Sequence, residues 1–202
     1  VTIIEPEDYD GEHADMDVFY LVVEGGSWQI PGAGTIMAGR DTTTDYMYYD
    51  GGSGGNYKEI SLGSTFTNPI LLAQRQTFKN ENSSPFPPKG SSWPWFTTAV
   101  WDGSSGRFKV ALEGSESTTK NLLESSVFGG RLIEERIGWI AFEAGQVDSF
   151  TDEAGHLIYF QTILSDPIIE GWDDGVNENI DFAGGLFSRD PCMVAVKQTR
   201  NC

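Results

Sequence analysis

The chain has 202 residues, of which 30 are acidic and 13 are basic, so its formal net charge is −17. This charge argues against nucleic acid and anionic membrane surfaces as partners, because binding to phosphate requires clustered Lys and Arg side chains. The mean hydropathy is −0.30, and since no apolar run approaches 18 residues, no membrane span is expected.

Short apolar runs alternate with Gly, Ser and Thr clusters along most of the chain. This rhythm is typical of strands and turns. It predicts an all-β protein built from antiparallel β-sandwich units. The expected strands cover residues 18–23, 60–62, 70–74, 107–112, 137–143, 158–163 and 192–197. FTTAVWD, at residues 96–102, also has the pattern of a strand, joined to the next one at DGSSG.

The first expected strand follows a turn-rich, acidic stretch over residues 1–17. It alternates Val18, Tyr20 and Val22 and closes on Glu24. The run DVFYLVVEGGS, at residues 17–27, resembles RIGWIAFEAGQ at residues 136–146, because both close on a glutamate followed by small residues.

A division of the chain follows from this repeat. The expected segments are a C-terminal part of a β-sandwich unit at 1–40, a Gly-rich linker at 41–56, a complete β-sandwich unit at 57–150 and an N-terminal part of a second unit at 151–202. The residues expected in the core of the β-sandwich are Ile70, Leu72, Phe108, Val110, Ile137, Trp139 and Ala141.

The last segment repeats the beginning of the complete unit. Asn68–Pro69 has a counterpart in Asp166–Pro167, and Val110–Leu112 has one in Val194–Val196. One unit is therefore expected to be split between the chain termini. Residues 14–26 complete it either by folding back within one chain or by entering a neighbouring molecule.

The complete unit resembles the H-type-lectin-like β-sandwich repeats of secreted and cell-surface proteins. The resemblance is carried by Q-x-Q-T at residues 74–77, by G-x-F-x-V-x-L at residues 106–112, and by the ending E-x-I-G-W-I-A-x-E-x-G at residues 135–145. It implies a β-sandwich fold and a secreted or cell-surface location.

No pattern of catalytic residues is apparent. His13 and His156 lie outside any metal-binding motif, and the chain has neither a nucleophile elbow nor a phosphate-binding glycine loop. No enzyme activity and no cofactor are expected.

One acidic loop carries oxygen ligands of the kind that calcium prefers. A solvated acidic loop without a metal is the alternative interpretation. The candidate ligands are Asp173, Asp174, Asn177, Asn179 and Asp181.

Trp93, Trp95 and Trp101 crowd one loop and the start of a strand. They are candidates for stacking on sugar rings, or for packing a loop at a contact between protomers.

Asn82 begins the glycosylation sequon Asn82–Ser83–Ser84, which predicts a covalent glycan. Cys192 and Cys202 are close enough in sequence to form a disulfide across a hairpin in an oxidising compartment; a free pair is the alternative.

Two functions agree with these features. The first is a structural protomer of an extracellular filament or surface assembly, joined head to tail by β-strand complementation and glycosylated. The second is a secreted, lectin-like carbohydrate-binding module. The sequence favours the first, because a lectin domain normally contains whole units, whereas one unit here is split.

Overall fold

The computed structural model describes residues 20–31, 34–47, 56–63, 65–80, 96–103, 106–114, 132–165 and 180–196. The regular structure in these ranges consists of ten β-strands. All but one of the strand pairs are antiparallel. The all-β prediction is therefore confirmed.

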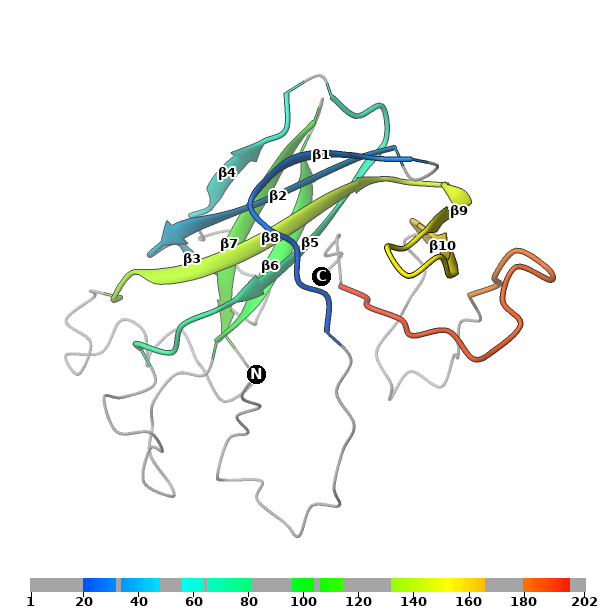
Figure 1. Ribbon diagram of the computed structural model, residues 1–202. Coiled ribbons are helices and arrows are strands. Elements are labelled where there is room, and N and C mark those ends of the chain that lie inside the picture. The colour runs from blue at the N-terminus through cyan, green and yellow to red at the C-terminus, as the bar shows by residue number, and fades with distance from the viewer. Residues whose placement is uncertain are drawn as a thin grey trace, which may run out of the picture.

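The first sheet has the order β1-β2-β8-β5 and is antiparallel throughout. Its strands are β1 (Gly26–Ile30), β2 (Gly34–Thr43), β8 (Glu135–Glu143) and β5 (Pro69–Arg75). The strand β8 is central and hydrogen-bonds β2 on one edge and β5 on the other. Figure 1 shows this sheet in front of the second one.

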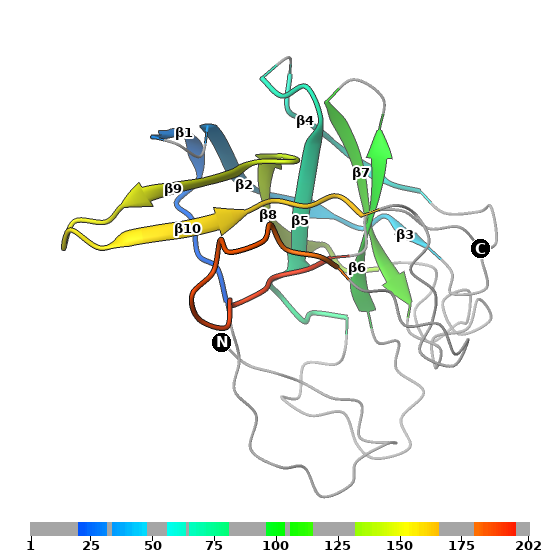
Figure 2. The same cartoon turned by 90° about the vertical axis from the view of Figure 1, so that its right-hand side faces the viewer.

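The second sheet is built around β7 (Arg107–Gly114). The strand β6 (Phe96–Gly103) runs along one edge of β7, and β4 (Lys58–Ser61) and the two-residue β3 (Tyr46–Met47) share the other edge. Only the short β3 pairs in parallel. The two sheets form separate layers in Figure 2.

Apolar side chains from both sheets meet in one core cluster, which makes the fold a β-sandwich. Phe108, Val110, Ile137 and Ala141 belong to this cluster, as predicted, and Trp139 packs against it. Because Leu71 pairs with Ala141, however, β5 turns Leu71 and Ala73 toward the core. The predicted core residues Ile70 and Leu72 lie on the opposite face of the sheet, since successive side chains of a strand alternate; Ile70 is buried there, as predicted, and Leu72 is half-buried.

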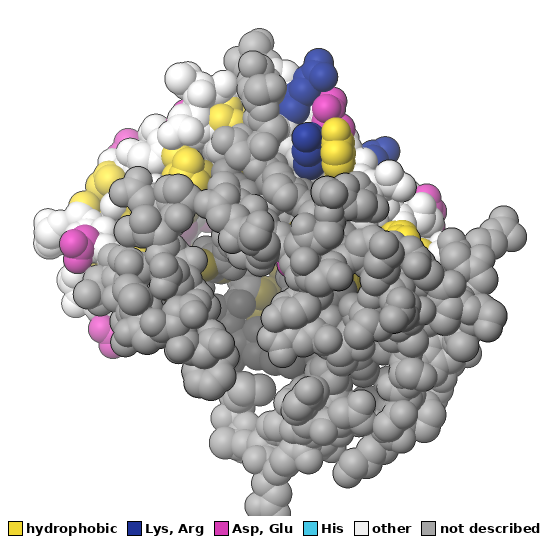
Figure 3. Space-filling model, turned by 180° about the vertical axis from the view of Figure 1, so that it is seen from behind, with side chains coloured by type: hydrophobic (Ala, Val, Ile, Leu, Met, Phe, Trp, Pro, Cys, Tyr) yellow, Lys and Arg dark blue, Asp and Glu magenta, His cyan; other side chains and the backbone are white. Residues whose placement is uncertain are grey.

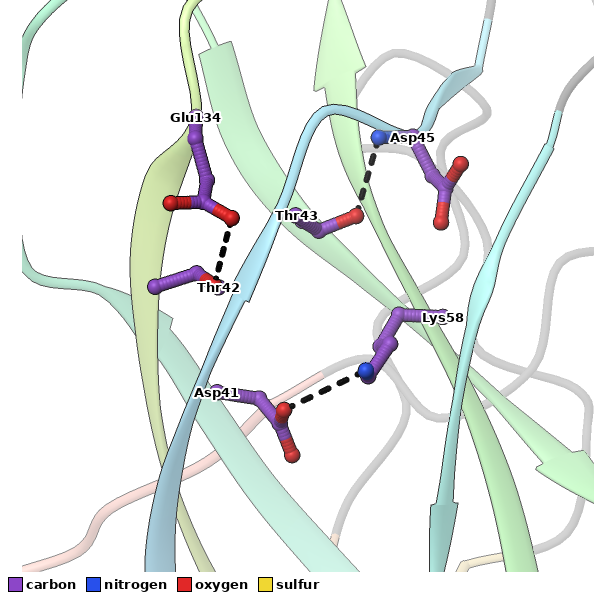
Figure 4. A network of polar contacts seen from close by, with 6 residues as sticks. All are labelled: Asp41, Thr42, Thr43, Asp45, Lys58 and Glu134. Atoms are coloured by element: carbon purple, nitrogen blue, oxygen red, sulfur yellow. Dashed lines mark hydrogen bonds and ion pairs between the residues drawn. The ribbon is translucent and has the colours of Figure 1, made fainter.

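The chain passes from the first sheet to the second at a polar corner after β2 (Figure 4). Lys58 Nζ lies 3.4 Å from Asp41 Oδ1, and Thr42 donates a 2.7 Å hydrogen bond to Glu134. Thr43 Oγ1 accepts a 2.9 Å hydrogen bond from the backbone of Asp45. These contacts attach β2 to both layers of the sandwich.

The strands differ from the expected division of the chain at this corner. A boundary at residue 40 and a linker at 41–56 are expected from the sequence, whereas β2 crosses residue 40 and β3 lies within that linker. Both strands gain backbone hydrogen bonds from the sandwich, through β8 and β7 respectively. The described sandwich, here called the intact unit, is therefore formed by the strands β1 to β8, which lie between residues 26 and 143; the Gly-rich residues 51–55 lie outside the described ranges.

A third, two-stranded sheet follows β8. It consists of β9 (Val147–Thr151) and β10 (Leu157–Gln161), which pair as an antiparallel hairpin. We call it the acceptor hairpin. It extends beyond the end of the first sheet in Figures 1 and 2.

Candidate assembly site

The described part of the predicted assembly strand, residues 20–24, is here called the donor segment. It forms no strand, although alternation of its apolar residues predicts one. Tyr20 is 68% exposed, Leu21 is 46% exposed and Val22 is 79% exposed. Val18 lies outside the described residues. In Figure 1 the donor segment passes in front of β8 and does not run alongside β10.

The acceptor hairpin is closed by a hydrogen-bonded turn between Asp152 and His156. The backbone amide of His156 donates a 2.7 Å hydrogen bond to Asp152 Oδ1, and His156 Nδ1 lies 3.0 Å from Oδ2. The backbone hydrogen bond, followed by that of the His156 side chain, lowers the pKa of Asp152 below its ordinary value of 3.8. The turn thus holds the two strands in register.

The acceptor hairpin exposes apolar side chains on β10. Leu157 is 52% exposed and Tyr159 is 46% exposed. Among the described strands, β10 pairs only with β9, so no described strand lies along its other edge. Such an edge is a template for pairing with another strand.

Residues 180–187 continue this apolar region beside the acceptor hairpin. The backbone amide of Ala183 donates a 2.9 Å hydrogen bond to the side chain of Gln161. Phe182 and Phe187 stack edge to face with centroids 5.6 Å apart, and Phe182 is exposed. The expected strand at 192–197 is not formed over its described residues 192–196.

The closing glutamate of the intact unit has a defined structural role. Glu143 accepts hydrogen bonds from the backbone amides of Thr67 (2.8 Å) and Asn68, and so fixes the turn that precedes β5. Glu24 is its counterpart in the donor segment by sequence. In the described structure the carbonyl oxygen of Glu24 accepts a 2.9 Å hydrogen bond from Trp28 Nε1.

A buried carboxylate that the sequence analysis did not single out anchors the loop after β5. Glu135 is fully buried and accepts hydrogen bonds from Thr77 Oγ1, from the amides of Lys79 and Asn80, and from the Asn80 side chain. Asn80 also exchanges two hydrogen bonds with the backbone of Ile133. The signal in the sequence is a glutamate at an inward position of an apolar strand. This anchor lies just before the predicted glycosylation site Asn82, which is outside the described residues.

The remaining candidate residues are only partly described. Trp101 lies on β6, whereas Trp93 and Trp95 are outside the described ranges. Of the five candidate calcium ligands only Asp181 is described, and it is exposed. The part of the chain that the structure describes contains no group of three or more His, Cys, Asp or Glu side chains able to hold a metal ion. Cys192 is exposed, and Cys202 is outside the described residues.

The far side of the molecule differs from the donor segment and the acceptor hairpin in its surface chemistry. Figure 3 shows basic side chains next to acidic and apolar ones along its upper edge. On the second sheet, Arg107 pairs with Glu59 at 3.2 Å, and Lys109 Nζ lies 4.3 Å from the ring centroid of Tyr57. Those groups have local partners, whereas the side chains of Tyr20, Leu21 and Val22 in the donor segment are exposed to solvent.

Comparison with known proteins gives no family assignment: no protein-family model, curated protein or solved structure matches the chain. Within the described residues, no helix has the length and apolar character that a transmembrane helix requires.

Proposed function

We propose that this protein is a structural protomer that joins copies of itself head to tail by β-strand complementation. The observation that carries the proposal is a pair of unsatisfied apolar elements. The donor segment exposes Tyr20 and Val22 without forming a strand, and no described strand pairs with the second edge of β10. In this proposal, residues 14–26 of one molecule enter the unit that begins with β9 of the next.

The energetics support association of these two elements. Burial of an apolar side chain contributes about 1.5–3 kcal/mol relative to exposure. The donor segment and β10 each offer several such side chains, and a newly paired strand also satisfies the backbone groups of the open edge. The contact joins two different surfaces, so it leaves a free donor and a free acceptor at the two ends and grows into a filament.

The sequence supports an extracellular setting for this assembly. An excess of acidic side chains keeps a protein soluble. The sequon at Asn82 provides a site for a covalent glycan in an exported protein. We therefore propose a glycosylated filament or surface assembly outside the cell.

Sedimentation velocity over a range of protein concentrations tests the proposal. The full-length chain is expected to form assemblies whose size rises with concentration. Removal of residues 1–25 leaves β1 intact and is expected to give a monomer. A peptide of residues 14–26 should block assembly of the full-length chain, whereas a peptide with the same residues in scrambled order should not. A full-length chain that stays monomeric at high concentration would refute the proposal.

A further inference from the structure

The acceptor hairpin has a structural counterpart in the intact unit, the hairpin β1–β2. The first strands of the two hairpins, β1 and β9, both have five residues. A glycine in the left-handed region lies near the start of the second strand in both hairpins: Gly34, with φ of 74°, is the first residue of β2, and Gly155, with φ of 85°, lies two residues before β10. Each hairpin also follows a segment that ends on a glutamate, Glu24 before β1 and Glu143 before β9.

The intact unit shows how the second strand of such a hairpin is used. The strand β2 pairs with β1 on one edge and with β8 on the other. Met37 lies opposite Ser27 of β1 and opposite Ala141 of β8. The strand β10 pairs with β9 in the same way, but its second edge has no partner among the described strands.

We propose that residues 18–24 of a second copy of this chain pair antiparallel with the open edge of β10, as β8 pairs with β2, with Val22 opposite Phe160. This inference rests on the proposed function and deepens it by fixing the partner and the register. The ladder positions give the register. Phe160 lies opposite Asp148 of β9, as Met37 lies opposite Ser27 of β1, and Val22 is the counterpart of Ala141.

Side-chain sizes in this register agree with the intact unit at one position and differ at another. In the intact unit Trp139 covers Gly39, where an added Cβ would collide with the indole ring. Thr162, which comes opposite Tyr20 in the proposed contact, carries a Cβ, so the tyrosine ring must lie beside this residue and not over it. Val22 opposite Phe160 repeats the small-and-large pairing of Ala141 with Met37.

The apolar pattern agrees as well. The strand β8 has apolar side chains on both faces, with Ile137 and Ala141 in the core and Ile140 half-buried on the outer face. Residues 18–23 are also apolar at every position. In the proposed register, the exposed side chains of Tyr159 and Leu164 come opposite Val23 and Val18, so burial covers apolar surface of both partners.

Disulfide trapping between two single-cysteine proteins tests the register. Both proteins carry Cys192→Ser and Cys202→Ser, with Tyr159→Cys in one and Val23→Cys in the other. A second pair combines Leu164→Cys with Val18→Cys. Directly opposite residues lie about 4.5–5.5 Å apart between Cα atoms, within disulfide range. Along an antiparallel ladder these two positions belong to opposite hydrogen-bonding classes, so at least one pair has favourable geometry.

The matched control combines Tyr159→Cys with Leu21→Cys. That pair is two residues out of register, at a diagonal Cα distance of roughly 7–8 Å, which is near or beyond the limit for a disulfide. Under mild oxidation the in-register mixtures are expected to give covalent 1:1 dimers roughly tenfold faster than the control. Sedimentation of the same mixtures before oxidation reports whether the copies associate.

The outcomes separate the register from the proposed function. If the copies associate but the control pair forms its disulfide faster than the in-register pairs, the proposed register is wrong and strand complementation is still supported. An absence of both association and trapping overturns both proposals. A chain that carries Tyr159→Cys and Val23→Cys together and closes only on itself at every concentration overturns the assignment to a second copy.

Discussion

At the scale of single residues, Glu135 explains how a carboxylate is tolerated inside the sandwich. Its oxygens accept hydrogen bonds from two backbone amides, a hydroxyl and an amide side chain, all on residues 77–80. A buried polar group is stable only when its hydrogen bonds are made, and here each bond also fixes the loop after β5. Glu135 thus couples the stability of β8 to the order of that loop.

We expect Glu135→Ala to lower the free energy of unfolding by about 2–4 kcal/mol, because it leaves buried donors on residues 77–80 without an acceptor. The neighbouring residue provides the control. Glu134 is exposed and accepts one hydrogen bond from Thr42, so Glu134→Ala should cost less than about 1 kcal/mol. Urea denaturation of the two variants and the parent protein measures both changes. Equal losses would contradict the role of Glu135.

The residues of β5 show that the local sequence does not always determine which side chains face the core. The strand β5 contains four consecutive apolar residues, Ile70, Leu71, Leu72 and Ala73. The apolar pattern therefore does not show which two of these side chains face the core. The pairing of β5 with β8 decides, because it places Leu71 opposite Ala141. In β7 the charged Lys109 separates Phe108 from Val110, and there the sequence identified the inward face correctly.

At the scale of elements, the turn of the acceptor hairpin predicts a dependence on pH. The contacts of Asp152 with His156 lower the pKa of its carboxyl group. A group whose folded pKa is lowered contributes stability above its unfolded pKa, and that contribution is lost as the pH falls through the folded value. The hairpin should therefore be unchanged from pH 7 to about 4 and lose order below that range.

Amide hydrogen exchange at His156, measured as a function of pH and corrected for the intrinsic exchange rate, tests this expectation. Protection should fall with the protonation of Asp152. The variant Asp152→Asn should have lower protection at pH 7 and little further change on acidification. Protection that rises as the pH falls through this range, or an unchanged profile in Asp152→Asn, would contradict the assignment.

The strands that the sequence missed share a physical cause. GSWQI and GTIMAG are short, glycine-rich runs separated by Pro31, and nothing local indicates that they form β1 and β2. Their order depends on pairing with β8, which is distant in sequence. The donor segment shows the converse: an apolar run is not a strand when no described strand edge pairs with it. The local pattern therefore predicted β4, β5, β6, β7, β8 and β10 but not which of these strands would pair with one another.

At the scale of the whole molecule, the described chain combines an intact sandwich with two unsatisfied elements. A contact between donor and acceptor uses two different surfaces, so each molecule can take part in two contacts at once. Substitution of one surface should leave the other functional. This property separates head-to-tail growth from a symmetric dimer, in which both partners use the same surface.

Mixing two complementary variants tests strand complementation most directly. Val22→Asp places a charge on the donor segment, Tyr159→Asp places one on β10, and Tyr57→Asp, at an equally exposed tyrosine of the intact unit, is the control. We expect the first two variants to be monomeric separately and the control to assemble like the parent protein. On mixing, the intact acceptor of Val22→Asp should bind the intact donor of Tyr159→Asp, and growth should stop at a 1:1 dimer in sedimentation velocity. Assembly of either variant alone, or a mixture that remains monomeric, would contradict the account.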